Sequence, residues 1–286
     1  MKTPDWVDTT AYPFAFHTLE HPDGRLHYLD EGRGPTLLFC HGTPEWSFGY
    51  RHLITRLSAH YRCVAVDMLG FGLSEKPVSA DYTVVAHALR LEWAVQTLNL
   101  KNITLIASDF GGGIALAYAL RHPENVRRIA LWNTWMWALN DDPHFARPAR
   151  LMQTGLGRFL YKSLNFSINV LMPQAYGNRR LLTPAVQRQY RMPFQHWSDR
   201  AAPHELAREI LNAGIWWDAR WAELDALREK PFLLLWGLTD RLVPPTALRR
   251  WRERLPEAGV VEYPEAGHFP HEECPEPLAA VLEKFL

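Results

Sequence analysis

Short apolar segments that end in turn residues recur along the chain and alternate with amphipathic segments. In the first half they are PTLLFCHG, YRCVAVDMLG, NITLIASD and VRRIALWN. Each has the length and the unbroken apolar character of a strand that is buried on both faces. The segments between them, such as residues 84–98 and 112–121, have helical apolar spacing. Strands that alternate with helices predict an α/β fold with a mostly parallel central sheet flanked by helices.

Other segments extend this pattern toward both ends of the chain. FAFHTLEHPDGRLHYLDEG alternates in polarity around Asp23-Gly24, which predicts an antiparallel hairpin before the first parallel strand. KPFLLLWG and VVEYPEAGH are expected to contain further strands, and residues 277–286 are expected to form the last helix.

The strand pattern stops after LWNTW. Residues 136–212 are rich in aromatic residues, Arg, Pro and Asn and contain helical segments but no convincing strand. We therefore expect a core made of residues 1–135 and 213–286, with a helical cap, residues 136–212, inserted after the sixth core strand. An insertion at the carboxyl end of such a strand lies above the sheet edge where folds of this class bind ligands, so the cap is interpreted as a lid.

Composition argues against several classes of partner. The 31 basic residues balance the 31 acidic ones and form no basic stripe, so no nucleic acid partner is expected. The three cysteines are scattered and indicate neither a disulfide framework nor a metal cluster. MKTPDWVDTT contains no apolar stretch, and no run approaches about 18 apolar residues. We expect a cytoplasmic protein without a signal peptide or a membrane partner; the oligomeric state is left open.

A carboxylate lies at the sharpest predicted turn. In LIASDFGGGIALAYAL an apolar strand turns directly into a helix, and Asp109 lies at the corner. A nucleophile elbow has small residues two positions before and after the nucleophile, because larger side chains would clash in the tight turn. Ala107 and Gly111 satisfy this frame around Asp109, whereas centring it on Ser108 would put bulky residues at both small positions. Asp109 is therefore the candidate nucleophile, and the alternative is that it only caps the helix.

The loop HGTP, residues 41–44, follows a predicted strand and can supply an oxyanion hole. In folds with such an elbow, one backbone N–H comes from this loop and another from the residue after the nucleophile. We assign these donors to Thr43 and Phe110, and we interpret His41 as a structural residue.

Two later loops supply a candidate acid and base. Asp240 in WGLTD follows a predicted strand and can orient a histidine, although an Asp in a loop is usually a turn residue. His268 in EAGHFPHEE is preferred as the base over His271. The spacing of these histidines resembles a metal pair, but no third ligand cluster supports one, so no metal is expected.

The chain order Asp109, Asp240, His268 is that of nucleophile, acid and base in α/β-hydrolases. A carboxylate with a pKa near ~4 is already ionised at neutral pH and can displace a good leaving group from saturated carbon. Water activated by His268 then hydrolyses the resulting ester of Asp109, while Asp240 holds the histidine in the required tautomer. This chemistry predicts alkyl halides or epoxides as substrates, with water as second substrate and no cofactor.

Five stretches resemble the haloalkane dehalogenase family: HGTPEWSFGYR, DMLGFGLSEKP, ASDFGGGIALAYALRHPENVRRIALWNTWMW, LLLWGLTD and AGHFPHEE. The resemblance covers most of the core but little of the cap. It implies an α/β-hydrolase fold and hydrolysis of a haloalkane to alcohol, halide and proton. The acid after LLLWG fits one branch of the family, while in other branches the acid follows the preceding strand, where this chain offers only Asn133 nearby.

Two positions depart from the family pattern. The resemblance implies a Trp directly after the nucleophile, with an indole N–H that holds the halide, and an Asn or Glu after HG. This chain has Phe110 and Thr43 there. Thr43 keeps a hydroxyl donor, and the candidates for the missing N–H are Trp135, Trp137 and Trp197.

Two alternative functions stay open at this point. An epoxide hydrolase resembles the chain in HGxPE, residues 41–45, and would need a cap tyrosine as proton donor; Tyr161, Tyr176 and Tyr190 are available. A binding protein with the same fold would sense a small apolar ligand without turnover. The complete set of Asp109, Asp240 and His268 argues against the second alternative.

Overall fold

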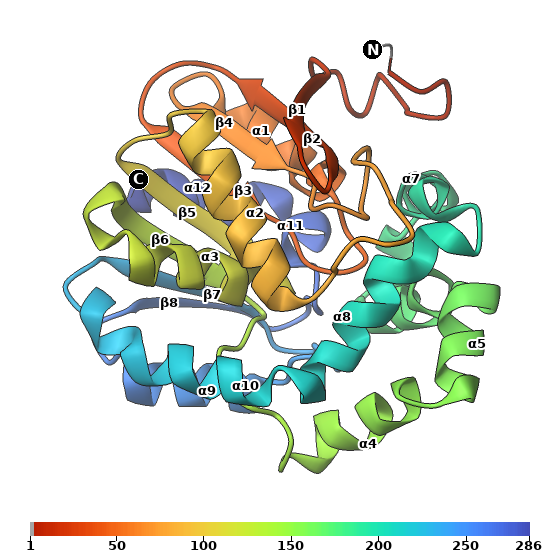
Figure 1. Cartoon of the computed structure of the whole chain (residues 1–286). Coiled ribbons are helices and arrows are strands. Elements are labelled where there is room, and N and C mark those ends of the chain that lie inside the picture. The colour runs from red at the N-terminus through yellow and green to blue at the C-terminus, as the bar shows by residue number, and fades with distance from the viewer. Residues whose placement is uncertain (1–2) are drawn as a thin grey trace.

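The computed structural model describes residues 3–286, which form an eight-stranded sheet with helices on both faces (Figure 1). The strand order is β1-β2-β4-β3-β5-β6-β7-β8. The strands are β1 (His17–His21), β2 (Gly24–Glu31), β3 (Thr36–Cys40), β4 (Arg62–Val66), β5 (Ile103–Ser108), β6 (Val126–Trp132), β7 (Phe232–Gly237) and β8 (Gly259–Tyr263).

The sheet is mostly parallel, which confirms the fold class expected from the sequence. Neighbouring strands from β4 to β8 pair in parallel, while β2 is antiparallel to β1 and to β4. β1 and β2 form the expected hairpin, in which His21 pairs with Gly24. The register pairs Cys40 with Ala107 and Ser108 with Trp132, so the carboxyl ends of β3, β5 and β6 meet at one edge of the sheet.

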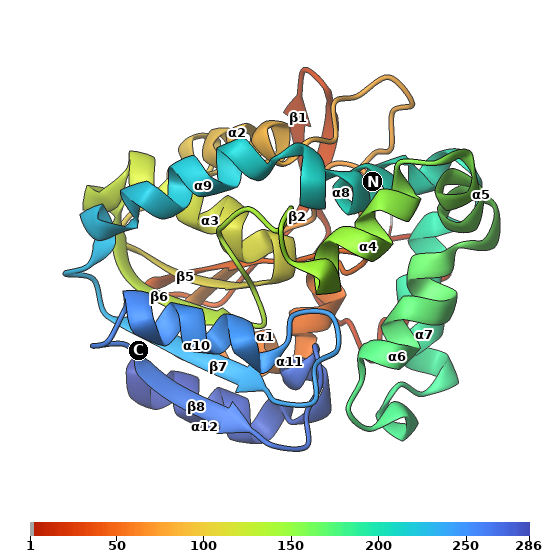
Figure 2. The same cartoon turned by 90° about the horizontal axis from the view of Figure 1, so that it is seen from below.

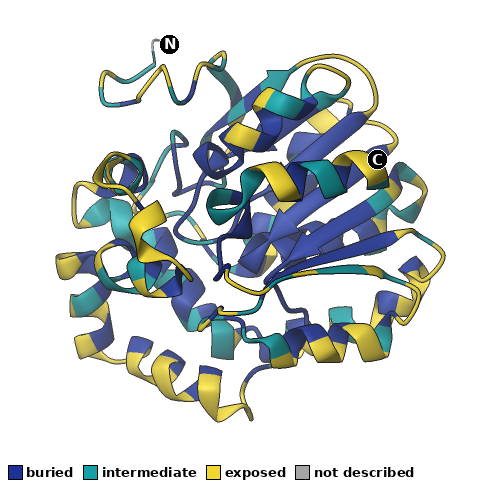
Figure 3. Cartoon of the chain, turned by 180° about the vertical axis from the view of Figure 1, so that it is seen from behind, coloured by how far each residue is buried: buried dark blue, intermediate teal, exposed yellow. Residues whose placement is uncertain are grey.

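Helices cover the two faces of this sheet (Figures 1 and 2). On one face lie α2 (Val84–Thr97), α3 (Asp109–Arg121) and α9 (Gly214–Glu223), with α10 (Pro245–Arg254) joined to α9 through the rings of Trp251 and Trp221. On the other face α1 (Arg51–Leu57) packs against α12 (Pro275–Phe285), next to the short α11 (Pro270–Glu273). Because both faces are covered, every residue of β3, β5 and β7 is buried (Figure 3).

The segment between β6 and β7 is helical and contains no strand among its residues, 133–231. Its helices before α9 are α4 (Pro143–Met152), α5 (Gly155–Leu164), α6 (Met172–Ala175), α7 (Pro184–Arg191) and α8 (Ala201–Asn212). Asp142, Thr154 and Thr183 cap α4, α5 and α7 through side-chain oxygens that accept backbone N–H groups. In Figure 1 these helices lie beside one end of the sheet rather than over its faces. The boundary expected at residue 212 falls between α8 and α9.

Two observations concern the expected environment of the chain. No helix within residues 3–286 is long and apolar enough to cross a membrane. Residues 1 and 2, the start of the segment expected to lack a signal peptide, lie outside the described residues.

Candidate active site

Asp109 lies where β5 turns directly into α3. Its φ of +49° is in the left-handed region, which is uncommon for a residue with a side chain. Two contacts support this backbone: the N–H of Asp109 donates to the carbonyl of Asn133 at 3.2 Å, and its carbonyl accepts from Thr134 Oγ1 at 2.6 Å. Helical spacing was recognised from residue 112, and the helix begins three residues earlier, at Asp109 itself.

The turn leaves no room for larger neighbours. A Cβ on Gly111 would lie 2.2 Å from the carbonyl oxygen of Cys40, and one on Gly112 would lie 2.2 Å from Thr134 Oγ1. Gly42, on the facing loop, has the same constraint, since a Cβ there would lie 2.3 Å from Asp109 Oδ1. These close approaches explain why the frame of small residues was readable in the sequence.

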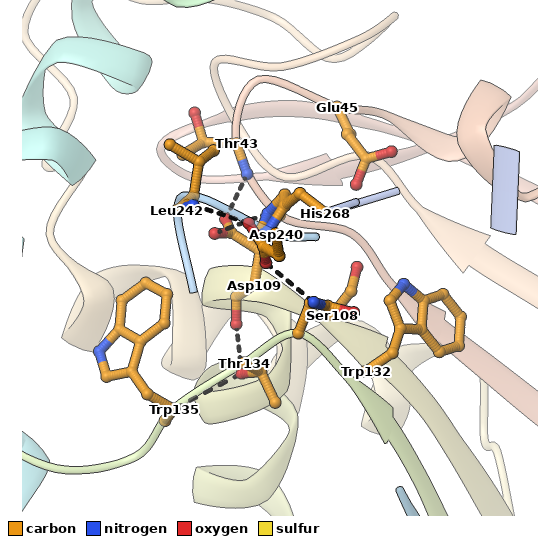
Figure 4. Close-up of polar contacts among 12 residues, drawn as sticks. Thr43, Glu45, Ser108, Asp109, Trp132, Thr134, Trp135, Asp240, Leu242 and His268 are labelled. Atoms are coloured by element: carbon orange, nitrogen blue, oxygen red, sulfur yellow. Dashed lines mark hydrogen bonds and ion pairs between the residues drawn. The ribbon is translucent and has the colours of Figure 1, made fainter. Parts of the chain in front are cut away.

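The carboxylate of Asp109 is held by groups from two other loops (Figure 4). Oδ1 accepts a hydrogen bond from the backbone N–H of Thr43 at 2.9 Å, and Oδ2 lies 3.3 Å from Nε2 of His268. No side chain caps α3, whose N-cap residue is Ser108. The interpretation of Asp109 as a simple helix cap is therefore wrong.

Asp240 holds the other side of the imidazole. Its Oδ2 lies 2.7 Å from Nδ1 of His268, and its Oδ1 accepts the backbone N–H of Leu242 at 2.7 Å. The side chains of Asp240 and His268 are almost completely buried. Asn133, at the end of β6, donates from Nδ2 to the same Oδ2 at 2.8 Å. The geometry thus brings together the three residues that the sequence analysis selected.

The charges around His268 set its protonation. Burial alone lowers its pKa, but the charges of Asp240 and Asp109 and the hydrogen bonds to both outweigh burial and hold the pKa well above its ordinary value of 6.5. The imidazole is therefore stable as a cation between two carboxylates while Asp109 is ionised. Its backbone is fixed as well, because the N–H of His268 donates to the carbonyl of Ala175 in α6 at 2.8 Å.

His271 does not compete for this position. Its Nδ1 accepts the indole N–H of Trp132 at 3.0 Å, and its Nε2 lies 2.8 Å from Glu45 Oε1. His271 and Glu45 are buried together behind the loop that carries Thr43. Within residues 3–286, no group of three or more His, Cys, Asp or Glu residues could hold a metal ion.

A cavity of about 330 Å³ lies above Asp109. Its volume is at the lower end of the usual range for small-molecule sites. Core residues form its floor, and its walls come from the segment between β6 and β7 together with the loop after β7. The lining residues on which the argument below rests are Thr43, Asp109, Trp135, His144, Tyr161 and Arg241.

Two buried donor atoms in this cavity have no hydrogen-bond partner among the described residues. They are Oγ1 of Thr43 and Nε1 of Trp135. Phe110 lies beside the same indole, with ring centroids 4.9 Å apart, and also lines the cavity. The backbone N–H of Phe110 is in the first turn of α3, where amides have no acceptor within the helix.

Two of the three candidate tryptophans lie elsewhere. Trp137 packs against Trp221, with ring centroids 4.9 Å apart, under the guanidinium of Arg250. Trp197 is 45% exposed, and Lys162 Nζ lies 3.6 Å from its ring centroid. Neither lines the cavity, so the expectation that they direct an indole N–H toward the nucleophile is wrong.

Of the three candidate tyrosines in the cap, Tyr161 lines the cavity and the other two do not. Tyr190 donates from its hydroxyl to Glu272, and Tyr176 packs against Phe269, with ring centroids 5.1 Å apart, without lining the cavity. Burial, and secondarily the charge of Asp109, raises the pKa of Tyr161 above its ordinary value of 10, so its hydroxyl is protonated at neutral pH.

Sequence reasoning missed two residues of the site. Asn133 was noted only for its position, although an Asn directly after a buried strand, next to the strand that precedes Asp240, was a usable signal. Arg241 lines the cavity, but its place next to an acid in WGLTD gave no sign of which way either side chain would point.

Comparisons with known proteins agree with this geometry. A family model described as the alpha/beta hydrolase fold matches residues 35–275. Haloalkane dehalogenase 2 of Mycobacterium tuberculosis is 36% identical over 281 residues, and the match covers 97% of each chain. A cis-3-alkyl-4-alkyloxetan-2-one decarboxylase of Shewanella oneidensis is 31% identical over 289 residues, which cover 97% of this chain and 90% of the relative.

A solved structure completes the comparison. The crystal structure of the haloalkane dehalogenase DatA from Agrobacterium tumefaciens has a TM-score of 0.84 at 27% identity and covers 95% of each chain. The strand order, the elbow after β5 and the sequence relatives all lead to one assignment. The chain belongs to the alpha/beta hydrolase fold family and is one of its haloalkane dehalogenase-like members.

Proposed function

We propose that this protein is a haloalkane dehalogenase that hydrolyses a carbon–halogen bond through an ester of Asp109. The observation that carries the proposal is the position of the Asp109 carboxylate at the floor of a mostly apolar cavity, with Oδ2 3.3 Å from Nε2 of a buried histidine. A carboxylate attacks saturated carbon without prior deprotonation, and an apolar cavity suits a haloalkane.

In the first step, Oδ2 of Asp109 attacks the carbon that bears the halogen. The new bond is C–O, the broken bond is carbon–halogen, and the halide leaves with the bonding electrons. Oδ2 is the attacking oxygen because Oδ1 is held by the backbone N–H of Thr43. Oδ1 then becomes the carbonyl oxygen of the ester and stays beside the donors that serve the second step.

In the second step, water attacks the ester carbonyl carbon and gives up a proton to His268. Loss of the negative charge of Asp109 on alkylation removes one of the interactions that raise the pKa of His268, so the imidazolium can release its proton to solvent and the neutral imidazole can then act as a base. The oxyanion forms on Oδ1, next to the N–H groups of Thr43 and Phe110. Removal of one such donor typically costs about 3 kcal/mol. Collapse breaks the bond between the carbonyl carbon and the alkyl oxygen, which takes the proton from His268 and leaves as the alcohol. The new carboxyl group of Asp109 loses its proton to solvent, which restores the carboxylate.

The leaving halide needs donors, and Phe110 offers no side-chain N–H. Oγ1 of Thr43 and Nε1 of Trp135 are the proposed substitutes, since both are buried in the cavity without a partner among the described residues. Trp135→Phe and Thr43→Val are each expected to weaken bromide binding and to slow halide release from 1-bromohexane. Trp137→Phe, outside the cavity, is the control.

A trapped ester tests the main proposal. The variant His268→Gln, incubated with 1-bromohexane, is expected to gain one hexyl group on the peptide that contains Asp109, as seen by mass spectrometry. Asp109→Asn is the matched control and is expected to gain none. A His268→Gln variant that releases no bromide and stays unmodified would contradict the proposed mechanism.

Epoxide opening is a second candidate, because Tyr161 lines the same cavity and is protonated at neutral pH. Its hydroxyl would donate a proton to the epoxide oxygen as Asp109 attacks the ring carbon. Tyr161→Phe would then abolish epoxide opening but leave bromide release from 1-bromohexane. A 3-alkyl-4-alkyloxetan-2-one, the compound class in the names of the decarboxylase relatives, is tested beside 1-bromohexane and an epoxide. The cytoplasmic location stays a prediction.

A further inference from the structure

Two side chains of opposite charge line the cavity. One is the carboxylate of Asp109 at the floor, and the other is the guanidinium of Arg241 in the loop between β7 and α10. The other lining residues are apolar or aromatic, apart from the polar residues Thr43, His144, Tyr161 and Ser167. The cavity is therefore apolar along its walls and charged at two places.

Arg241 is free to bind a ligand. It is exposed, whereas its neighbour Asp240 is turned inward and 4% exposed. Within residues 3–286, no hydrogen bond, ion pair or ring contact involves the guanidinium of Arg241. By contrast, Arg62 and Arg254, also at the surface, are paired with Asp30 and Asp225.

We propose that Arg241 forms an anion subsite at the mouth of the cavity and that the preferred substrates are alkyl halides with a carboxylate at the other end of the chain. The inference rests on the proposed function and specifies its substrate class. A guanidinium presents a planar set of donors that matches a carboxylate. The apolar walls weaken the screening of this pair by water relative to an open surface.

The two charges also determine the orientation of such a substrate. The carboxylate is attracted to Arg241 and repelled by Asp109, so it stays at the mouth. The alkyl chain then lies along the apolar walls, and the halogenated carbon at its other end reaches Oδ2 of Asp109. An uncharged bromoalkane gains nothing from this arrangement.

Matched substrates test the subsite. We compare kcat/KM for 6-bromohexanoate and for its methyl ester, which differ in the charge at the end of the chain. The wild-type protein is expected to prefer the acid, and Arg241→Gln is expected to lower the ratio of the two values about two- to fivefold, as fits an exposed ion pair. Arg249→Gln removes the same charge from α10 outside the cavity and is expected to leave the ratio unchanged. A ratio unchanged in Arg241→Gln overturns the proposal.

A binding measurement separates this inference from the proposed function. Hexanoate has no leaving group, and its affinity for the wild-type protein is measured by calorimetry at two salt concentrations. Arg241→Gln is expected to weaken hexanoate binding about two- to fivefold, with most of the loss at low salt. If hexanoate binding depends on Arg241 but no bromo compound is turned over, the subsite stands and the dehalogenase proposal fails. If bromo compounds are turned over but Arg241→Gln leaves the affinity for hexanoate unchanged, the dehalogenase proposal stands and the anion subsite fails.

Discussion

Nδ2 of Asn133 lies 2.8 Å from Oδ2 of Asp240, the same carboxylate oxygen that lies 2.7 Å from Nδ1 of His268. The amide of Asn133 also bonds the backbone of Gly237, accepting its N–H at 3.0 Å and donating to its carbonyl at 3.2 Å. One buried side chain therefore ties the end of β6 to the end of β7 and orients the candidate acid.

Removal of this amide is expected to reduce stability and hydrolysis together. Asn133→Ala leaves the N–H of Gly237 and Oδ2 of Asp240 each short of a partner, which should cost about 1–3 kcal/mol of unfolding free energy. Urea denaturation measures the loss. Asn140→Ala, at an exposed amide that donates to Leu211, is the control and should cost less. Equal effects would contradict the role assigned to Asn133.

A carboxylate at position 133 should partly replace the acid. Asp240→Asn is expected to slow hydrolysis of the ester far more than its formation, because His268 loses its charged partner. The double variant Asn133→Asp with Asp240→Asn restores a carboxylate next to the same imidazole, and we expect partial recovery of the second step. Rapid-quench measurement of ester accumulation distinguishes the two steps. No recovery in the well-folded double variant would show that the position of the acid, and not only its charge, is decisive.

The pKa of His268 should depend on the charge of Asp109. Asp109→Asn removes a negative charge beside Nε2 and is expected to lower the pKa of His268, as NMR titration would measure. Because the folded-state pKa is raised above the ordinary 6.5, the stabilisation that it supplies is fully present below pH 6.5 and is lost as pH rises through the folded value. As pH rises from 6.5 through the folded-state pKa, the free energy of unfolding of Asp109→Asn should therefore fall less than that of the wild-type protein. Identical pH–stability curves would contradict this coupling.

A tryptophan after the nucleophile should strengthen halide binding. Phe110→Trp adds an indole N–H beside Asp109, and we expect bromide to bind about tenfold more tightly in a fluorescence titration. The larger ring must fit against Trp135, so a stability loss of about 1–3 kcal/mol can accompany the gain. Phe145→Trp, on the cavity wall, is the control for added bulk. Unchanged bromide affinity in Phe110→Trp would show that the donors lie elsewhere.

The elbow should not accept a methyl group. A Cβ at position 111 would lie 2.2 Å from the carbonyl oxygen of Cys40 and 2.4 Å from that of His41, so Gly111→Ala is expected to destabilise the fold by about 1–3 kcal/mol. Gly155→Ala, where nothing lies within 4 Å, is the control and should be neutral or slightly stabilising. Thermal unfolding of both variants checks the difference.

Local patterns in the sequence were sufficient for most of the fold. Buried parallel strands leave continuous apolar runs, and the hairpin at Asp23-Gly24 leaves an alternating pattern. The elbow around Asp109 was readable for the same reason, since its close contacts permit only small residues at fixed positions. The start of α3 was misplaced by three residues, since helical spacing was recognised only from residue 112 and the helix begins at Asp109.

The cap side of the cavity could not be predicted residue by residue. Trp135, Trp137 and Trp197 are alike in sequence, yet only Trp135 lines the cavity that contains Asp109, because the packing of helices distant in sequence decides where each indole lies. For the same reason, Tyr161 lines the cavity and Tyr176 and Tyr190 do not. The exposure of Arg241 beside an inward-facing Asp240 likewise depends on the contacts of one loop with β6 and with His268.

The hydrogen bond from the amide of His268 to the carbonyl of Ala175 joins the base to the inserted segment. Chimeras that transplant this segment from a relative should keep α6 and its junction native, and exchange only α4, α5, α7 and α8. Such grafts would alter which molecules enter while the proton-transfer machinery keeps its alignment. A donor segment whose backbone does not bring a carbonyl oxygen to the position of the Ala175 carbonyl would leave the N–H of His268 without its acceptor. The histidine would then be less firmly held, however well the helices of that segment fold.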